Sequence, residues 1–232
     1  AELAVREQEF HRNSGLLDGG VLVLALFTLI AGFINHNRNY LVFAAWLVVN
    51  LRMAALSMGW DHQWLGQTIP FAWLVWMRPL TLALYFLATV VLFRALFEQD
   101  LAKAGVDTWV RRVQWLSVPL VALALVLPYG RFLPIIWVCT ALGTAVLAYS
   151  LTRLLIRTHS RVAMWYAASI TVALFASLYE VAAAALGLKG LLGAVNSVTA
   201  ALASSLLASL AIAEQMRQEH QERLAAQEEL SH

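Results

Sequence analysis

The chain has 232 residues, of which 61% are hydrophobic and 13% are charged, whereas roughly 25% of the residues of a soluble domain are charged. This composition excludes a soluble globular protein and indicates an integral membrane protein. The formal net charge of +2 is too small to indicate nucleic acid as a partner. The single cysteine, Cys139, excludes an intrachain disulfide.

Seven apolar windows of about 20 residues, the length that a helix needs to cross a hydrocarbon core, follow one another along the chain. They fall at about 16–35, 39–59, 69–95, 113–128, 131–152, 162–187 and 190–214. The fourth and fifth are separated only by Pro128-Tyr129-Gly130-Arg131, which predicts a tight hairpin or, as an alternative, a re-entrant pair. The longest connection runs from Phe97 to Arg112. No strand-like alternation recurs, so we predict an all-α, polytopic membrane protein built as a seven-transmembrane helix bundle.

The last window passes, without Gly or Pro, into the polar sequence EQMRQEHQERLAAQEELSH. One helix is therefore expected to leave the membrane and to continue as a C-terminal cytoplasmic stalk. The predicted parts are an N-terminal segment (1–14), a transmembrane domain (15–213) and the stalk (214–232). The 3,4 spacing of a coiled-coil seam is followed by Ala213, Met216, His220, Arg223, Gln227 and Leu230. Half of these are polar, so a solvated single helix and a dimeric stalk both fit.

Lysine and arginine are distributed unevenly between the two sides of a chain with seven crossings. The side of the stalk carries Arg38, Arg94, Lys103, Arg111, Arg112, Arg153, Arg157, Arg161, Arg217 and Arg223. The opposite side carries Arg6, Arg12, Arg131 and Lys189. Because short cytoplasmic loops are rich in Lys and Arg, we expect the C-terminus in the cytoplasm and the N-terminus outside.

Polar residues lie within or beside the apolar windows at one common depth: Arg52, Arg78, Glu180, Asn196 and Asp18. At 1.5 Å per residue, the first four lie roughly 9–14 Å below the outer boundary, and Asp18 is within reach of the same layer. One interpretation is a polar pocket for an anionic or zwitterionic ligand. The other is a structural set of ion pairs, with Arg52 snorkelling to the surface. Pro79, next to Arg78, can kink the third helix.

Small residues recur every fourth position in the last window, at Ser197, Ala201, Ser205, Ser209 and Ala213, and Met216 follows them. Such a ridge lets a second helix approach closely, which makes these residues candidates for a signal relay. The alternative is that Ala and Ser are simply abundant in this window.

The sequence contains no recognisable catalytic or metal-binding motif. The six histidines are scattered, and neither GxSxG nor HExxH occurs. The two lysines, Lys103 and Lys189, lie in predicted loops, so a retinal Schiff base is excluded. We therefore expect neither a cofactor nor a metal site nor catalytic residues. The alternative to a receptor is a small-molecule transporter or channel subunit lined by Arg52, Arg78 and Glu180, although no broken-helix pair or internal repeat favours it.

Four short motifs can be compared with a known family. The first window opens as Gly15-Leu-Leu-Asp-Gly-Gly and leads to Asn37-Arg38-Asn39-Tyr40-Leu41; the second ends at Gly59-Trp60. The third ends as Phe93-Arg94-Ala95-Leu96-Phe97, and the last passes into the stalk through Ser209-Leu-Ala-Ile-Ala-Glu-Gln-Met-Arg217. Over nearly its whole length the chain thus resembles the bacterial seven-transmembrane receptors with diverse intracellular signalling modules.

The resemblance implies a sensor region in the bacterial inner membrane, working in two-component or cyclic di-GMP signalling. In that family a periplasmic ligand-binding domain often precedes the first helix, and a histidine kinase, a diguanylate cyclase or a phosphatase follows the stalk. Residues 1–14 are then the remnant of a preceding domain, and the output domain lies beyond His232, so that this chain is not an enzyme. The partners implied are membrane lipid, an unknown small ligand and a second copy of the chain, bound through the stalk.

Overall fold

The computed structural model of the chain describes residues 19–34, 36–57, 62–64, 67–158, 161–171, 209–210, 212–218, 220–221 and 224. Helices dominate these ranges, in agreement with the predicted all-α class. The first described helix is Gly19–Ile34. It is followed by α2 (Arg38–Ser57), α3 (Phe71–Ala104), α4 (Asp107–Val126) and α5 (Tyr129–Thr158). Further helical segments cover 161–171 and 212–218.

A small β hairpin that the sequence did not predict lies between α2 and α3. Its strands are β1 (Gln63–Trp64) and β2 (Gln67–Thr68), and they pair antiparallel, with Gln63 opposite Thr68. The amide of Ile69 donates to the carbonyl of His62 at 2.8 Å and closes the hairpin. These hydrogen bonds satisfy backbone amide and carbonyl groups of the connection between α2 and α3. Only Pro70 lies between Ile69 and the start of α3.

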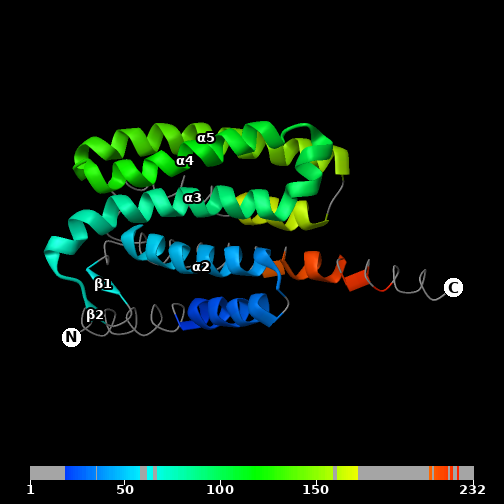
Figure 1. Ribbon diagram of the computed structural model, residues 1–232, viewed down its shortest axis with the longest axis horizontal. Coiled ribbons are helices and arrows are strands. Elements are labelled where there is room, and N and C mark those ends of the chain that lie inside the picture. The colour runs from blue at the N-terminus through cyan, green and yellow to red at the C-terminus, as the bar shows by residue number, and fades with distance from the viewer. Residues whose placement is uncertain are drawn as a thin grey trace, which may run out of the picture.

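Helix α3 lies at the centre of the described bundle. It packs against α2 on one side and against α4 and α5 on the other, and α4 also packs against α5 (Figure 1). The indole of Trp46 on α2 donates to the hydroxyl of Thr89 on α3 at 3.2 Å. On the other side, Gly143 of α5 lies against the ring of Phe86. Successive helices are antiparallel, and Leu127-Pro128 joins α4 to α5 in the tight hairpin that the sequence predicts.

Helix α3 keeps helical backbone angles at Pro79, where the sequence allows a kink, and departs from them at Phe97 (φ −118°, ψ 21°). Proline removes one backbone donor within a helix. Near it, the Thr81 hydroxyl bonds the carbonyl of Met77 at 2.6 Å, and Pro79 itself is buried in well-packed surroundings. The break in helical backbone angles lies 18 residues beyond the proline, at Phe97.

The predicted long connection from Phe97 to Arg112 is also wrong, because both of its halves are helical. Helix α3 runs to Ala104, α4 starts at Asp107, and only Gly105-Val106 links them. Gly105 has a left-handed conformation (φ 72°); its amide bonds the carbonyl of Ala102, and that of Val106 bonds the carbonyl of Leu101. These two bonds form a Schellman motif, and the buried Leu101 and Val106 supply the apolar contact that accompanies it.

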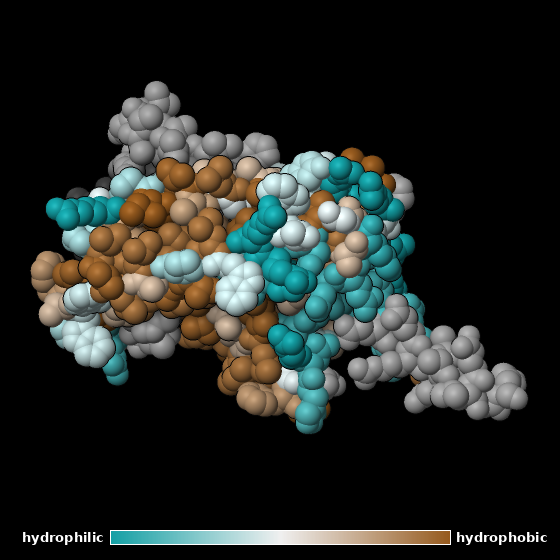
Figure 2. All heavy atoms as spheres, turned by 45° about the horizontal axis from the view of Figure 1, so that its top comes forward, coloured by the Kyte–Doolittle hydropathy of each residue, from teal (hydrophilic) through white to brown (hydrophobic). Residues whose placement is uncertain are grey.

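The described helices have the length and surface expected of membrane spans. Four are long and apolar enough to cross a bilayer, and Gly19–Ile34 is a shorter apolar helix. Large apolar side chains such as Phe27, Trp115 and Trp137 are exposed on their outer sides. Figure 2 shows hydrophobic residues over the middle of the bundle, and hydrophilic residues gathered toward the end at which α3 turns into α4. The apolar side chains that face the neighbouring helices are buried, and they form one continuous core between the helices.

Candidate functional site

The predicted polar layer is only partly within the described residues. Arg52 lies on α2 and is 7% exposed, and Arg78 lies half-buried on α3. Both arginines have interaction partners, as a charge that is removed from water requires. Asp18, Glu180 and Asn196 lie outside the described residues. The layer therefore stays a prediction, and so does the choice between a ligand pocket and structural ion pairs.

The predicted relay ridge is described only at its end. Ser197, Ala201 and Ser205 lie outside the described residues. Ser209 is half-buried, whereas Ala213 and Met216 are exposed. The buried position in this stretch is Ile212, at 5% exposure, and it belongs to the apolar core of the bundle. Among the described residues of this segment, the large apolar side chain of Ile212 joins the core of the bundle. The role of the ridge itself stays a prediction.

The richest cluster of interactions lies at the α3–α4 end, which we define as the end of the bundle that carries the turn Gly105-Val106. Three aromatic rings meet there. Phe93 and Phe97 of α3 lie with ring centroids 5.2 Å apart, and Tyr166 of the segment 161–171 lies 5.6 Å from Phe93 and 5.5 Å from Phe97. All three are at most 4% exposed. Aromatic pairs in such tilted and edge-on geometries add to the energy of apolar burial, so this trio fastens the bend of α3 to the segment 161–171.

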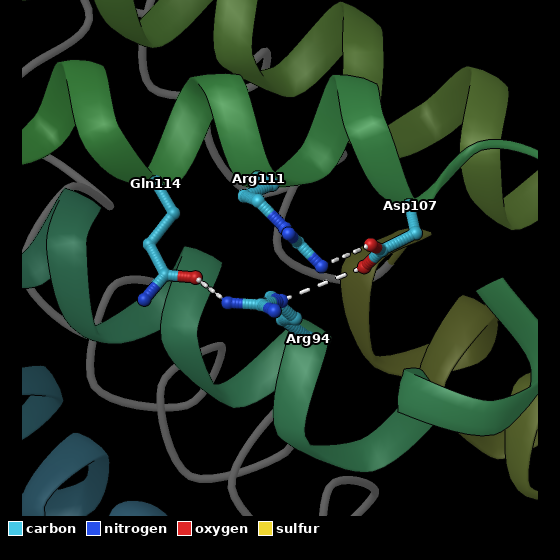
Figure 3. Close-up of polar contacts among 4 residues, drawn as sticks. All are labelled: Arg94, Asp107, Arg111 and Gln114. Carbon is cyan, nitrogen blue, oxygen red and sulfur yellow. Dashed lines mark hydrogen bonds and ion pairs between the residues drawn. The ribbon is translucent and has the colours of Figure 1, made fainter. Parts of the chain in front are cut away.

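A polar network joins α3 to the start of α4 one turn away from the bend (Figure 3). The Arg94 guanidinium donates to Gln114 Oε1 at 2.8 Å, and its Nε lies 3.5 Å from Asp107 Oδ1. The other carboxylate oxygen of Asp107 accepts from Arg111 at 2.8 Å. Asp107 also lies in the first turn of α4, where the helix dipole favours a negative charge. The network therefore fixes the angle between α3 and α4 on the polar side of the Schellman turn.

Helix α5 reaches the same end of the bundle through Arg157. Its Nη1 lies 3.5 Å from the carbonyl of Ala104, the last residue of α3. A guanidinium at a helix C-terminus compensates carbonyl groups that have no partner within the helix. Side-chain and backbone contacts therefore connect the end of α3 to the start of α4 and to the end of α5, next to the aromatic trio.

Asp107→Asn is expected to lower the free energy of unfolding by about 1 kcal/mol, because it removes the negative charge that pairs with two arginines, Arg94 and Arg111, that are only partly in water. Thermal unfolding in mild detergent, followed by circular dichroism, measures the change. Asp100→Asn is the matched control, since it removes the same charge from α3 at this end of the bundle but outside the network. Equal Tm values for the two variants would contradict a structural role for Asp107.

The sequence reasoning missed most of this site. Phe93 and Phe97 were noted only as part of a motif, and Arg94 only there and among the basic residues of one side. Asp107 was only part of a predicted connection, and Gln114 was only part of the fourth apolar window. Two signals were available. Gly105 after a polar helical stretch is typical of a helix C-terminus, and Asp107 four residues before Arg111 is a common helical ion pair. Among the described residues, no group of histidine, cysteine and carboxylate side chains has the arrangement of a metal site.

Residues 13–215 match the sequence profile of the family described as 7TM diverse intracellular signalling. Neither the curated proteins nor the solved structures that were compared with the chain gave a match. The matched range includes the described helices from Gly19 to Thr158 and the helical segment 161–171, and it includes the motif from Phe93 to Phe97 at the bend of α3. The chain therefore belongs to the 7TM diverse intracellular signalling family and is a transmembrane sensory receptor region.

Proposed function

We propose that this region senses an extracytoplasmic or membrane-borne ligand or state and relays it through the last helix to a cytoplasmic output domain joined after the stalk. The output domain is of the histidine kinase or diguanylate cyclase type, so the signal enters two-component or cyclic di-GMP signalling. The chain itself carries no catalytic step in this proposal. Its task is mechanical, which means that a change in helix packing alters the position, rotation or order of the stalk.

The burial of Ile212 carries the proposal. Ile212 is part of the core that also contains Phe97 and Tyr166, and two residues later the chain becomes polar at Glu214. The segment 212–218 is helical, and Arg217 bonds Glu214 at 2.8 Å on its exposed side. A movement of the bundle core would therefore act on the helix at the point where it leaves the apolar phase.

We place the protein in the bacterial inner membrane, with the N-terminus outside and the stalk in the cytoplasm. The charges of the described residues support this orientation. The starts of α2 and α4 and the ends of α3 and α5 share one end of the bundle (Figure 1). Basic residues near these helix ends are Arg38, Arg94, Lys103, Arg111, Arg112, Arg153 and Arg157, whereas the opposite end carries Arg131, in the first turn of α5. Excess positive charge marks the cytoplasmic side.

Arg52, Arg78, Glu180, Asn196 and Asp18 form the ligand layer in this proposal. The burial of Arg52 within α2 supports a role beyond surface snorkelling, because a guanidinium at 7% exposure is kept there only by anionic or polar partners. Two arginines in such a layer favour a ligand that carries a carboxylate or a phosphate.

The second copy of the chain binds through the stalk in this proposal. Exposed Ala213, Met216 and His220 follow the spacing of a seam, and the exposed Met216 is an apolar side chain suited to such a contact. Cysteine cross-linking measures this directly: Met216→Cys in a Cys139→Ser background is expected to give a disulfide-linked dimer in membranes, whereas Gln218→Cys serves as the control outside the seam. Equal cross-linking at both positions would contradict the seam.

The relay is tested by fusing a diguanylate cyclase after His232 and inserting one to seven alanines at the junction. A helical relay predicts that cyclic di-GMP output rises and falls with a period of 3.5 to 3.6 residues, because each inserted residue rotates the output domain by about 100°. Output that does not change with insertion length would contradict the relay and would favour a transporter or channel.

The same fusion tests the ligand layer. Arg78→Gln is expected to abolish the response to stimulus while the protein stays folded, and Arg131→Gln, on the same side of the bundle, is the control. If Arg78→Gln and Glu180→Gln both leave the response and the stability intact, neither a ligand pocket nor a structural ion-pair set exists at these residues.

A further inference from the structure

We propose that the outward side of α4 and α5, at the α3–α4 end, binds the headgroup of an anionic phospholipid. The two helices are antiparallel and pack against each other, so the start of α4 and the end of α5 lie side by side. Arg111 and Arg112 lie in the second turn of α4, and Arg153 lies in the last two turns of α5. Arg111 is 55% exposed, and all three reach the surface.

Within α4 and α5, the positive charge of this surface exceeds the negative charge. Asp107 is the only carboxylate in α4 and α5. One of its oxygens accepts from Arg111 at 2.8 Å, and the other lies 3.5 Å from Arg94, which comes from α3. Asp107 is therefore shared between Arg111 and Arg94. Arg112 and Arg153 add two further positive charges, which favour the binding of an anion. A guanidinium suits a phosphate particularly well, because its planar array of donors matches two phosphate oxygens at once.

Aromatic side chains hold two of these arginines in place. Arg112 lies over the ring of Trp109, with its central carbon 5.1 Å from the ring centroid. Arg153 lies 5.4 Å from the ring centroid of Tyr149, and its Nε donates to the Tyr149 hydroxyl at 3.0 Å. Cation–π contacts of this kind orient the guanidinium while its remaining donors stay free for a ligand. Trp109 and Tyr149 are both about half exposed, as is typical of aromatic residues at the level of lipid headgroups.

The surface lies at the border of the apolar exterior. Trp115 and Leu116 follow Arg112 within one turn on α4, and both are exposed; Leu142 and Val138 lie further down α5, and they are exposed as well. Arg112 extends back to Trp109, and Arg111 extends back to Asp107, so both charges reach away from the apolar side. A phosphate held by the arginines would therefore leave its acyl chains along exposed apolar side chains. This combination selects a phospholipid over a soluble anion or an acidic protein, neither of which would cover the apolar part.

The test is a lipid titration of the whole chain, purified in a neutral detergent, with bound lipid counted by native mass spectrometry. Dioleoyl phosphatidylglycerol is compared with dioleoyl phosphatidylcholine, which has the same acyl chains and no net charge. We expect the chain to retain phosphatidylglycerol in preference. Arg111→Gln/Arg112→Gln/Arg153→Gln should weaken this binding by at least about tenfold, with phosphatidylcholine retention unchanged. Arg131→Gln, an exposed arginine at the other end of the two helices, should leave both unchanged.

Because Arg111 also belongs to the Arg94 network, a second variant leaves it in place. Arg112→Gln/Arg153→Gln is expected to fold with the circular dichroism spectrum of the parent chain and to lose most of the preference for phosphatidylglycerol. Arg112→Lys/Arg153→Lys keeps both positive charges and should retain part of the preference for phosphatidylglycerol. Equal retention of the two lipids by the parent chain would overturn the proposal. So would unchanged phosphatidylglycerol binding by the double glutamine variant. Because the assay measures binding without an output domain, its result is independent of the proposed relay.

Discussion

Phe93→Ala is expected to lower the free energy of unfolding by about 3–5 kcal/mol, the range for removing a buried phenylalanine. Phe93 has no exposed surface, and its ring meets those of Phe97 and Tyr166 at 5.2 and 5.6 Å. The substitution leaves a cavity at the bend of α3 and removes two aromatic pairs at once. Unfolding in mixed detergent micelles with increasing dodecyl sulfate, followed by circular dichroism, measures the loss.

Phe71→Ala is the matched control for this substitution, because Phe71 lies on the same helix and is 78% exposed. Its stability should change by less than about 0.5 kcal/mol. A second measurement uses the diguanylate cyclase fused after His232. Loss of the aromatic contacts should change basal cyclic di-GMP output in the Phe93→Ala variant and not in the Phe71→Ala variant. A loss of less than about 1 kcal/mol for Phe93→Ala would mean that the trio does not hold the bend.

Gly143→Ala is expected to destabilise the protein by about 1–3 kcal/mol through overpacking. A β-carbon at Gly143 would lie 2.5 Å from the ring carbons Cε2 and Cζ of Phe86, whereas carbon atoms in good contact lie about 3.5–4.0 Å apart. Phe86 is 5% exposed, so its ring cannot turn aside without moving its neighbours. Helices α3 and α5 would have to separate. The same micelle unfolding experiment measures the effect.

Two further variants identify the cause. Gly130→Ala changes a glycine of the same helix where an added β-carbon meets nothing within 4 Å, and we expect it to leave stability unchanged or to raise it by up to about 1 kcal/mol. Phe86→Leu in the Gly143→Ala background removes the obstructing ring and should recover part of the loss. If Gly143→Ala is as stable as the parent chain, the close contact between α3 and α5 does not exist.

Hydropathy located the helices of this protein better than it located their ends. The window for the second helix, 39–59, agrees with α2 at Arg38–Ser57 to within two residues. The window for the third stopped at residue 95, whereas α3 continues to Ala104. Hydropathy measures how favourably a segment transfers into lipid. The last part of α3 contains the polar residues Glu98, Gln99 and Asp100, so hydropathy does not mark it as part of the helix. At about 50 Å, α3 is longer than the hydrocarbon core is thick.

The candidate site depended on contacts between residues far apart in the chain. Arg94 and Gln114 are 20 residues apart, and Arg157 and Ala104 are 53 apart. Each residue alone looked like an ordinary charged or polar group near a membrane boundary. The first contact follows from the Schellman turn at Gly105, which reverses the chain within two residues and places the start of α4 beside the end of α3. The second follows from the packing of α5 against α3. The glycine was visible in the sequence, but the partners that its turn brings together were not.

The sequence by itself determined that this is a helical membrane protein, and its motifs identified the family that the profile match confirms. These conclusions rest on composition and on local patterns, because the free energy of placing an apolar segment in lipid is close to a sum over its own residues. Only the tertiary structure decided where α3 bends, which rings pack at the bend and that Ile212 belongs to the core. Those features depend on which faces of separate helices meet, and packing between helices is set by side-chain shape and polar pairing that no single segment contains.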